Sequence, residues 1–330
     1  IQHDTGNTGL IDLQVAYLCV SLLRFLCIHL YTKKQYPDLS LHSSHAVSLR
    51  EIPQKREVFI IKSASLITYI IPIILISAFC SLKDASVYAV YFLIFNAIKL
   101  LLHTLSNGTS GIFGKTLADS SDKERINIIF DKYESMYFSA AGFLYSCAAI
   151  LALPFLSIYT HKMTDANYYQ PALIWLFVAI GLGELRIPAD LLCTAAGKFK
   201  MLRTRGIIEL FINIICSCTL LQFYGFYGII LGSLLSATYS TINIISYTNS
   251  HVLNRPQHQS INKLLLITLP LIITYYVSTK YHIEFTTTNK YSDWIKLATL
   301  TSIFYLVIYW TIFTIIKIIT RNYKNNTATI

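Results

Sequence analysis

The sequence predicts an all-α protein that crosses a membrane many times, as a polytopic bundle of about nine helices. Its composition is 54% hydrophobic and only 13% charged, whereas a soluble globular domain has about 25% charged residues. The apolar residues also gather in continuous runs of roughly 20, the length that crosses about 30 Å of hydrocarbon. The alternation typical of membrane β-strands is missing, and backbone groups in lipid must bond within the protein, so the runs are expected to be helices.

Nine such runs follow one another, and we expect each to be one transmembrane helix. They are 10–31, 58–80, 85–106, 134–158, 170–194, 206–222, 226–249, 262–279 and 293–317. The two polar connections 32–57 and 107–133 are expected to be cytoplasmic loops, and neither is long enough for an ordinary catalytic domain. Within the second, the sequence DSSDKERINIIFDKYES predicts a short amphipathic helix at the membrane interface.

The connections between the predicted spans alternate in charge. One set, together with the first turns of the adjoining helices, carries 19 Lys and Arg residues, and the other set carries four. Because positive residues are retained on the cytoplasmic side, the N-terminus is predicted to face outward and the C-terminus to face the cytoplasm, as an odd number of spans requires. The basic set is 32–57, 107–133, 195–205, 250–261 and the tail after 317.

Topology therefore explains most of the basic residues behind the net charge of +10. No stripe of Lys and Arg interleaved with aromatic residues occurs in a soluble segment, so a nucleic-acid partner is not expected. Four basic residues within spans stay unexplained: Arg24, Lys99, Arg186 and Lys296. Lys296 lies one turn inside its span, from which its side chain can reach the interface. Each of the others costs about 2.5–3.5 kcal/mol near the centre of a helix, which predicts a polar cavity, a partner or both.

The stretch GLGELRIPADLL, residues 181–192, places three charged residues and a proline inside one apolar run. Arg186 and Asp190 are four positions apart, so they share a helix face and can pair, whereas Glu184 points elsewhere. Pro188 removes a backbone hydrogen bond and is expected to kink the helix, and the two glycines allow local unwinding or close approach. Two interpretations stay open: these groups line an aqueous cavity, or the ion pair only locks helix packing.

We take Arg24, Lys99, Arg186, Asp190 and Glu184 as the candidate residues of a substrate cavity. In this hypothesis Arg186 attracts an anionic substrate, and Asp190 holds the guanidinium in place while the site is empty. The hypothesis follows from the cost of charge inside a membrane span.

No constellation of catalytic or metal-binding residues stands out. The sequence contains no HExxH, GxSxG, Walker A or GxGxxG motif. The seven Cys lie in or beside apolar runs without a CxxC spacing, as small hydrophobic core residues do. We therefore expect no enzyme activity, cofactor, metal or disulfide. Glu209 and Asn213, four positions apart near the end of a span, are interpreted as an interfacial polar pair, with a cavity role as the alternative.

Several segments in order along the chain resemble the polysaccharide-transporter, or O-antigen-type flippase, branch of the multidrug/oligosaccharidyl-lipid/polysaccharide flippase superfamily. Each motif alone is weak, whereas the collinear set is fairly specific and covers most of residues 10–250. The segments are ASVYAVYFLIFNAIK, GTSGIFGKTLAD, LPFLSIYT followed by NYYQPALIWLF, LRIPADLLCTAAGKFK, and GIIELFINIICSCTLLQFYGFYGIILGSLLSATYS.

The resemblance implies a two-lobed bundle of six plus six helices, with two extra helices at the C-terminal end. Residues 1–57 would hold the last helix of the first lobe and the loop between the lobes, residues 58–249 the second lobe, and residues 250–330 the extra pair and a cytoplasmic tail. Because the chain begins without Met or a signal-peptide pattern, we expect an N-terminal part to precede it, and the resemblance implies that this part holds five helices.

The function that the resemblance implies is the flipping of lipid-pyrophosphate-linked oligosaccharides across the inner membrane of the cell, by alternating access, for surface polysaccharide or lipopolysaccharide synthesis. The implied partners are that substrate, membrane lipids and a coupling ion, H+ or Na+. Many relatives have an acidic residue in the helix after the long cytoplasmic loop. Here SLITYIIPIILISAF has Pro72 and no charge, so coupling through that position is not expected.

Two other functions fit a polytopic bundle. A drug or cation antiporter of the same superfamily would favour acidic over basic cavity residues. A membrane glycan polymerase or glycosyltransferase would need a sizeable outward loop with catalytic Arg, His or Asp, and the longest outward loop predicted here is only 280–292.

Overall fold

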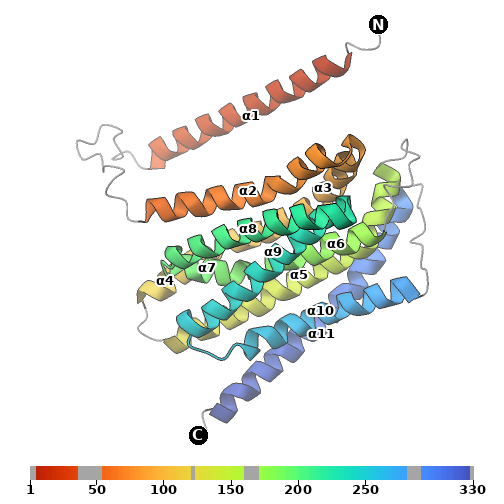
Figure 1. The fold of residues 1–330 in the computed structure, drawn as a ribbon. Coiled ribbons are helices and arrows are strands. Elements are labelled where there is room, and N and C mark those ends of the chain that lie inside the picture. The colour runs from red at the N-terminus through yellow and green to blue at the C-terminus, as the bar shows by residue number, and fades with distance from the viewer. Residues whose placement is uncertain (1–4, 36–53, 120–122, 160–170, 281–290, 328–330) are drawn as a thin grey trace. The chain divides into compact units, whose positions relative to one another are not determined.

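The structure, a computed structural model, describes residues 5–35, 54–119, 123–159, 171–280 and 291–327. The chain divides into two units, Ile1–Pro53 and Gln54–Ile330. The first unit contributes one long helix, α1 (Thr5–Gln35), whose apolar side chains are exposed along its length. The second unit contains all the other helices (Figure 1). No β-strand occurs among the residues listed above.

The second unit is a bundle of helices joined by short connections. The long helices are α2 (Lys55–Phe79), α3 (Leu82–Asn107), α5 (Lys123–Tyr159), α8 (Phe199–Tyr224), α9 (Phe226–Tyr247), α10 (His258–Lys280) and α11 (Tyr291–Thr327). The shorter elements are α4 (Ser110–Asp119), α6 (Pro171–Gly181), the 3₁₀ segment η2 (Leu182–Arg186), α7 (Ile187–Ala195) and the π-helical turn η3 (Thr248–Val252).

Nine helical segments in the described part of the chain are long and apolar enough to cross a membrane, and they coincide with the nine predicted spans. The all-α fold is therefore confirmed, and the chain is a multi-pass membrane protein. Large apolar side chains such as Leu100, Phe211, Ile242 and Leu300 remain exposed on the second unit, as lipid-facing positions require.

The predicted interfacial helix before 134 is wrong. Residues from Lys123 onward are instead the first turns of α5, which is continuous to Tyr159. Two charged residues of this segment, Asp131 and Glu134, have partners inside the protein. Glu134 is only 2% exposed and contacts both Arg255 and Lys263 at 3.0 Å and 2.9 Å.

These contacts belong to a cluster that joins α5 to the start of α10, which we call the α5–α10 clamp: Asp131, Glu134, Asn249, Arg255, Ser260 and Lys263. The Ser260 hydroxyl donates to Glu134 Oε1 at 2.6 Å, and Arg255 Nε donates to Asn249 Oδ1 at 2.6 Å. Lys263 also pairs with Asp131. The clamp has two carboxylates and two cations, so it is formally neutral, as buried charge requires.

The predicted span 170–194 is broken into α6, η2 and α7, as the kink at Pro188 predicts. A 3₁₀ segment inside a membrane helix changes the direction of its side chains and frees backbone groups. The glycines of the break are needed for packing. A Cβ on Gly181 would lie 2.2 Å from the Tyr145 ring of α5, and one on Gly183 would lie 3.0 Å from Ala237 Cβ of α9. The break is thus wedged between α5 and α9.

The helices α8 and α9 form a tight hairpin and lie side by side (Figure 1). A Cβ on Gly228 would lie 2.2 Å from the Leu220 carbonyl oxygen, and one on Gly232 would lie 2.3 Å from Ser217 Oγ. Glycine at these two positions therefore lets the backbones meet, as GxxxG motifs do in membranes. The buried centre of the unit is unusually aromatic, with Tyr91, Tyr137, Tyr145, Phe130 and Phe138 all below 2% exposure.

Candidate functional site

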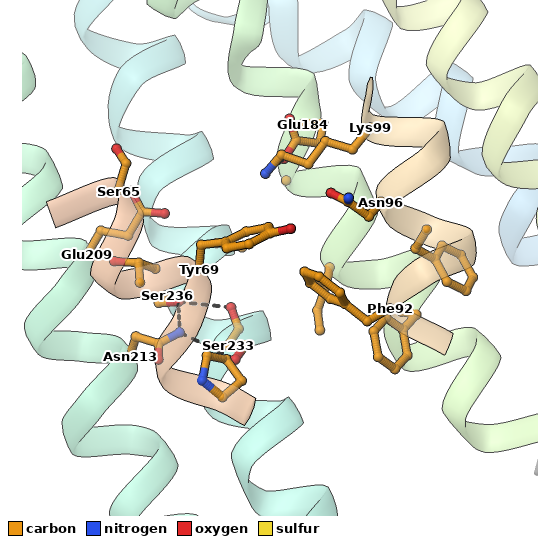
Figure 2. A pocket seen from close by; sticks show the side chains of 18 of the residues that line it. Ser65, Tyr69, Phe92, Asn96, Lys99, Glu184, Glu209, Asn213, Ser233 and Ser236 are labelled. Atoms are coloured by element: carbon orange, nitrogen blue, oxygen red, sulfur yellow. Dashed lines mark hydrogen bonds and ion pairs between the residues drawn. The ribbon is translucent and has the colours of Figure 1, made fainter. Parts of the chain in front are cut away.

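A cavity of about 430 Å³ lies inside the second unit, between α2, α3, α6–η2, α8 and α9 (Figure 2). Its size falls within the range of small-molecule sites, which commonly span about 300–1,000 Å³. The lining contains an aromatic wall, a group of amide and hydroxyl side chains, and a set of charged residues. Each group combines residues from at least two helices, so the cavity depends on the assembly of the bundle.

The aromatic wall comes from α2, α3 and α6. The rings of Tyr69 and Phe92 meet edge to face with centroids 5.0 Å apart. Phe177 of α6 stacks on Phe95 at 5.3 Å and packs on Tyr88 at 5.4 Å. The contacts hold the rings in fixed orientations, so the wall offers flat apolar faces of defined geometry.

The polar group lies on α8 and α9, in the view of Figure 2 opposite the aromatic ring of Phe92. The Asn213 amide donates to Ser236 Oγ at 3.1 Å and to Ser233 Oγ at 3.4 Å. Asn213 is 2% exposed, although it lines the cavity. The remaining hydrogen-bonding capacity of the two serines is available to a polar ligand.

Lys99 and Glu184 form an ion pair at one end of the cavity. Lys99 lies on α3, and its Nζ is 2.8 Å from Glu184 Oε1 of η2. His103, one helical turn after Lys99, places its Nε2 3.2 Å from the other oxygen of the same carboxylate. The Lys99 ammonium also lies 5.9 Å from the centroid of the Tyr69 ring, within cation–π range.

Arg186 is held by a carboxylate that the sequence analysis assigned elsewhere. Its Nη1 donates to Glu209 Oε1 at 2.5 Å and to Ser240 Oγ at 2.9 Å. The predicted partner, Asp190, lies farther away, with 3.8 Å between Arg186 Nε and Asp190 Oδ2. Asp190 instead makes its close ion pair with Arg205, at 2.6 Å. The expectation that Asp190 holds Arg186 is therefore corrected in one respect: the predicted i,i+4 pair is present, but Glu209 makes the closer contact.

The reason for this correction is the 3₁₀ geometry of η2. Arg186 is the last residue of η2, so its side chain leaves the chain in a direction that a continuous α-helix would not give it. The guanidinium reaches α8 and α9, where Glu209 and Ser240 also bond to each other at 2.8 Å. Arg205 donates to the same Ser240 hydroxyl at 2.9 Å. The Ser240 hydroxyl thus links Arg186, Glu209 and Arg205, and two members of this network, Arg186 and Glu209, line the cavity.

Of the predicted cavity residues, Lys99, Glu184 and Arg186 line the cavity. Asp190 lies behind Arg186 and is not among the lining residues. Arg24 lies on α1 in the first unit with an exposed side chain, and its role stays a prediction.

Two charged residues of this lining, Glu209 and Lys62, were not among the predicted cavity residues. Glu209 lines the cavity and is only 8% exposed, so the interpretation as an interfacial polar pair is wrong, and the cavity role that was its alternative fits. Its spacing from Asn213 was the available signal, because two polar groups on one face of an apolar helix need a polar neighbour. Lys62 of α2 also lines the cavity. Because Lys62 lies near the end of a predicted span, the sequence does not distinguish it from the lysines that only determine which end of a helix is cytoplasmic.

The described residues offer no evident metal site. No group of three or more His, Cys, Asp or Glu side chains in this part of the chain is arranged to hold an ion. The carboxylates of the cavity contact nitrogen atoms of Lys, His and Arg rather than each other.

Comparison of the chain with models of known protein families, with curated proteins and with solved structures finds no match.

Proposed function

We propose that the protein flips a lipid-pyrophosphate-linked oligosaccharide across the cell (inner) membrane, by alternating access, for surface polysaccharide synthesis of the O-antigen type. The observation that carries the proposal is the charge balance of the cavity. Both of its lining carboxylates are neutralised: Glu184 by Lys99 at 2.8 Å and Glu209 by Arg186 at 2.5 Å. Lys62 lines the same cavity, and no ion pair of Lys62 with another described residue is found.

This balance favours an anionic substrate. The charged lining residues are three cations and two carboxylates, which leaves one positive charge in excess. A cation antiporter needs a carboxylate that is free to bind its substrate, whereas each carboxylate in this lining already contacts a cation. Lys62, which supplies the excess charge, is exposed toward the cavity, so its ammonium is available to an anion.

The rest of the lining suits the two other parts of such a substrate. Aromatic faces such as that of Tyr69 can cover the apolar side of a sugar ring or the first units of a lipid chain. Amide and hydroxyl groups, here Asn213, Ser233 and Ser236, can bond sugar hydroxyls. Guanidinium groups bind phosphate oxygens in pairs, and Arg186 is the guanidinium that lines the cavity.

The helix order supports the same proposal. The spans formed by α2, α3, α5, α6–α7, α8 and α9 make a set of six, and α10 with α11 makes an additional pair. This order agrees with a second lobe followed by two extra helices. In the proposed orientation the N-terminus of the chain faces outward, and the C-terminus is cytoplasmic, because the basic connections lie on one side.

A binding experiment tests the proposal. The chain is placed in nanodiscs of neutral lipid, and three ligands are compared: a polyprenyl-pyrophosphate-linked oligosaccharide, the polyprenyl monophosphate, and tetraphenylphosphonium as an organic cation. We expect the first to bind at least about 10-fold more tightly than the second, since its diphosphate carries more charge and more acceptor oxygens. Binding of the cation without binding of the pyrophosphate lipid would replace this proposal by the cation-antiporter function.

A further inference from the structure

Glu184 is contacted on both carboxylate oxygens by two bases from the same face of α3. Lys99 Nζ lies 2.8 Å from Oε1, and His103 Nε2 lies 3.2 Å from Oε2. The two bases are four residues apart, which places them on neighbouring turns of one helix face. The carboxylate side chain is 10% exposed, whereas the histidine side chain is 44% exposed.

The contact defines which nitrogen of His103 can take up a proton. A neutral imidazole that donates to Glu184 must carry its hydrogen on Nε2, and Nδ1 is then the free basic atom. Histidine is the side chain that ordinarily changes its charge between pH 5 and 8.

Apart from Lys62, the charged groups around Glu184 balance one another. Three cations (Lys99, Arg186, Arg205) oppose three carboxylates (Glu184, Asp190, Glu209), and all are ion-paired. The other titratable groups that face this region are Lys62 and Tyr69 of α2, which line the cavity with Lys99, and Tyr137 and Tyr145 of α5, which are within electrostatic range of Glu184. A proton on His103 therefore adds a positive charge that no second carboxylate neutralises.

We propose that His103 and Glu184 form a proton-binding site that increases the affinity of the cavity for a pyrophosphate anion. Protonated His103 takes a larger share of the Glu184 carboxylate, so Lys99 becomes available to the anion. The inference rests on the proposed function, because it assumes an anionic ligand in the cavity. By linkage the effect is reciprocal: an anion bound near Lys99 promotes proton uptake at His103.

The test measures binding of inorganic pyrophosphate to the full chain in nanodiscs of neutral lipid at pH 5.5 and pH 8, together with the protons taken up on binding. His103→Gln keeps a donor toward Glu184 but cannot be protonated, and pyrophosphate itself titrates equally for every variant. His251→Gln is the matched control. His251 lies in η3 and stacks on Tyr247, the last residue of α9, away from this carboxylate. His103→Asn repeats the test if the first variant does not fold.

We expect the affinity of the wild type to rise on acidification by about 10-fold more than that of His103→Gln, within the range usual for coupled sites. The His251→Gln variant should behave as the wild type does, and the extra proton uptake should vanish only in the His103 variants. If pyrophosphate binds and the His103 variants keep the full pH dependence, the proton site is wrong while the proposed function stands. If pyrophosphate binds at neither pH, both proposals fail.

Discussion

The guanidinium of Arg186 and the carboxylate of Glu209 meet at 2.5 Å, although 23 residues separate them along the chain. The contact joins the 3₁₀ segment η2 to α8 at the wall of the cavity. Asp190 makes its close pair with Arg205, and Ser240 links the two pairs because both guanidinium groups donate to its hydroxyl.

Replacing Glu209 alone should destabilise the protein. Glu209→Leu leaves Arg186 with only the more distant Asp190 as a charged partner. Loss of one partner of a buried ion pair costs about 3–5 kcal/mol. Arg186→Leu/Glu209→Leu should recover most of that loss, because apolar replacements of a buried pair are often neutral. Thermal unfolding in detergent measures both effects. Although it recovers stability, the double variant should not bind the pyrophosphate lipid, because the Arg186 guanidinium is gone. Normal binding by the folded double variant would leave the pair with a packing role only.

Lys62 should contribute to ligand affinity without supporting the fold. Lys62 is exposed toward the cavity and is found in no ion pair with the other described residues. Lys62→Ala is therefore expected to weaken pyrophosphate-lipid binding by about 5-fold, which is the effect of one charge in a partly hydrated site. The unfolding temperature should stay within about 2 °C. Lys296→Ala is the control, because Lys296 is an exposed lysine paired with Asp293 outside this lining. Equal losses in the two variants would contradict a specific role for Lys62.

The α5–α10 clamp should carry stability rather than binding. Glu134→Gln leaves Arg255 and Lys263 with only Asp131 as a charged partner, so the free energy of unfolding should fall by about 3 kcal/mol or more. Ligand affinity per folded molecule should be unchanged, because none of these residues lines the cavity. Asp293→Asn, which breaks an exposed pair worth at most about 1 kcal/mol, serves as the comparison. A larger effect of Asp293→Asn on unfolding would contradict the assignment.

Gly181→Ala should be poorly tolerated. The added Cβ would lie 2.2 Å from the buried Tyr145 ring, so α6 or the ring must move, at a cost of about 1–3 kcal/mol. Gly114→Ala in α4, where no heavy atom lies within 4 Å of the added Cβ, should be neutral or slightly stabilising. Chemical or thermal unfolding of the two variants in the same detergent checks the difference. Similar stabilities would show that the C-terminal end of α6 is not packed tightly against α5.

The orientation can be tested with reporter fusions. Fusions at positions 40, 120, 200 and 255 should report a cytoplasmic location, and fusions at 165 and 285 an outward one, since Lys and Arg gather in the first group of connections. A paired set of an export-dependent and a cytoplasm-dependent reporter at each position provides the internal control. One clear inversion among the six positions would break the nine-span orientation.

The spans and the break near Pro188 were predictable because both depend on local sequence. A transmembrane helix requires about 20 apolar residues of its own. Proline and glycine act on the backbone where they stand. The same local logic placed Lys99 and Arg186 in a cavity, because charge inside a span needs a polar neighbour wherever the span lies.

The sequence by itself therefore determined the helix count, the kinked span and the presence of costly charges. Only the tertiary structure decided which groups meet: Arg186 with Glu209 rather than chiefly with Asp190, and Glu184 with both Lys99 and His103. Such pairs depend on the rotation of each helix about its axis and on the side-chain directions that η2 imposes. A helix whose surface is nearly all apolar carries no sequence pattern that predicts its rotation or these directions. For the same reason a count of basic residues could not distinguish Lys62, which lines the cavity, from the lysines that only set topology.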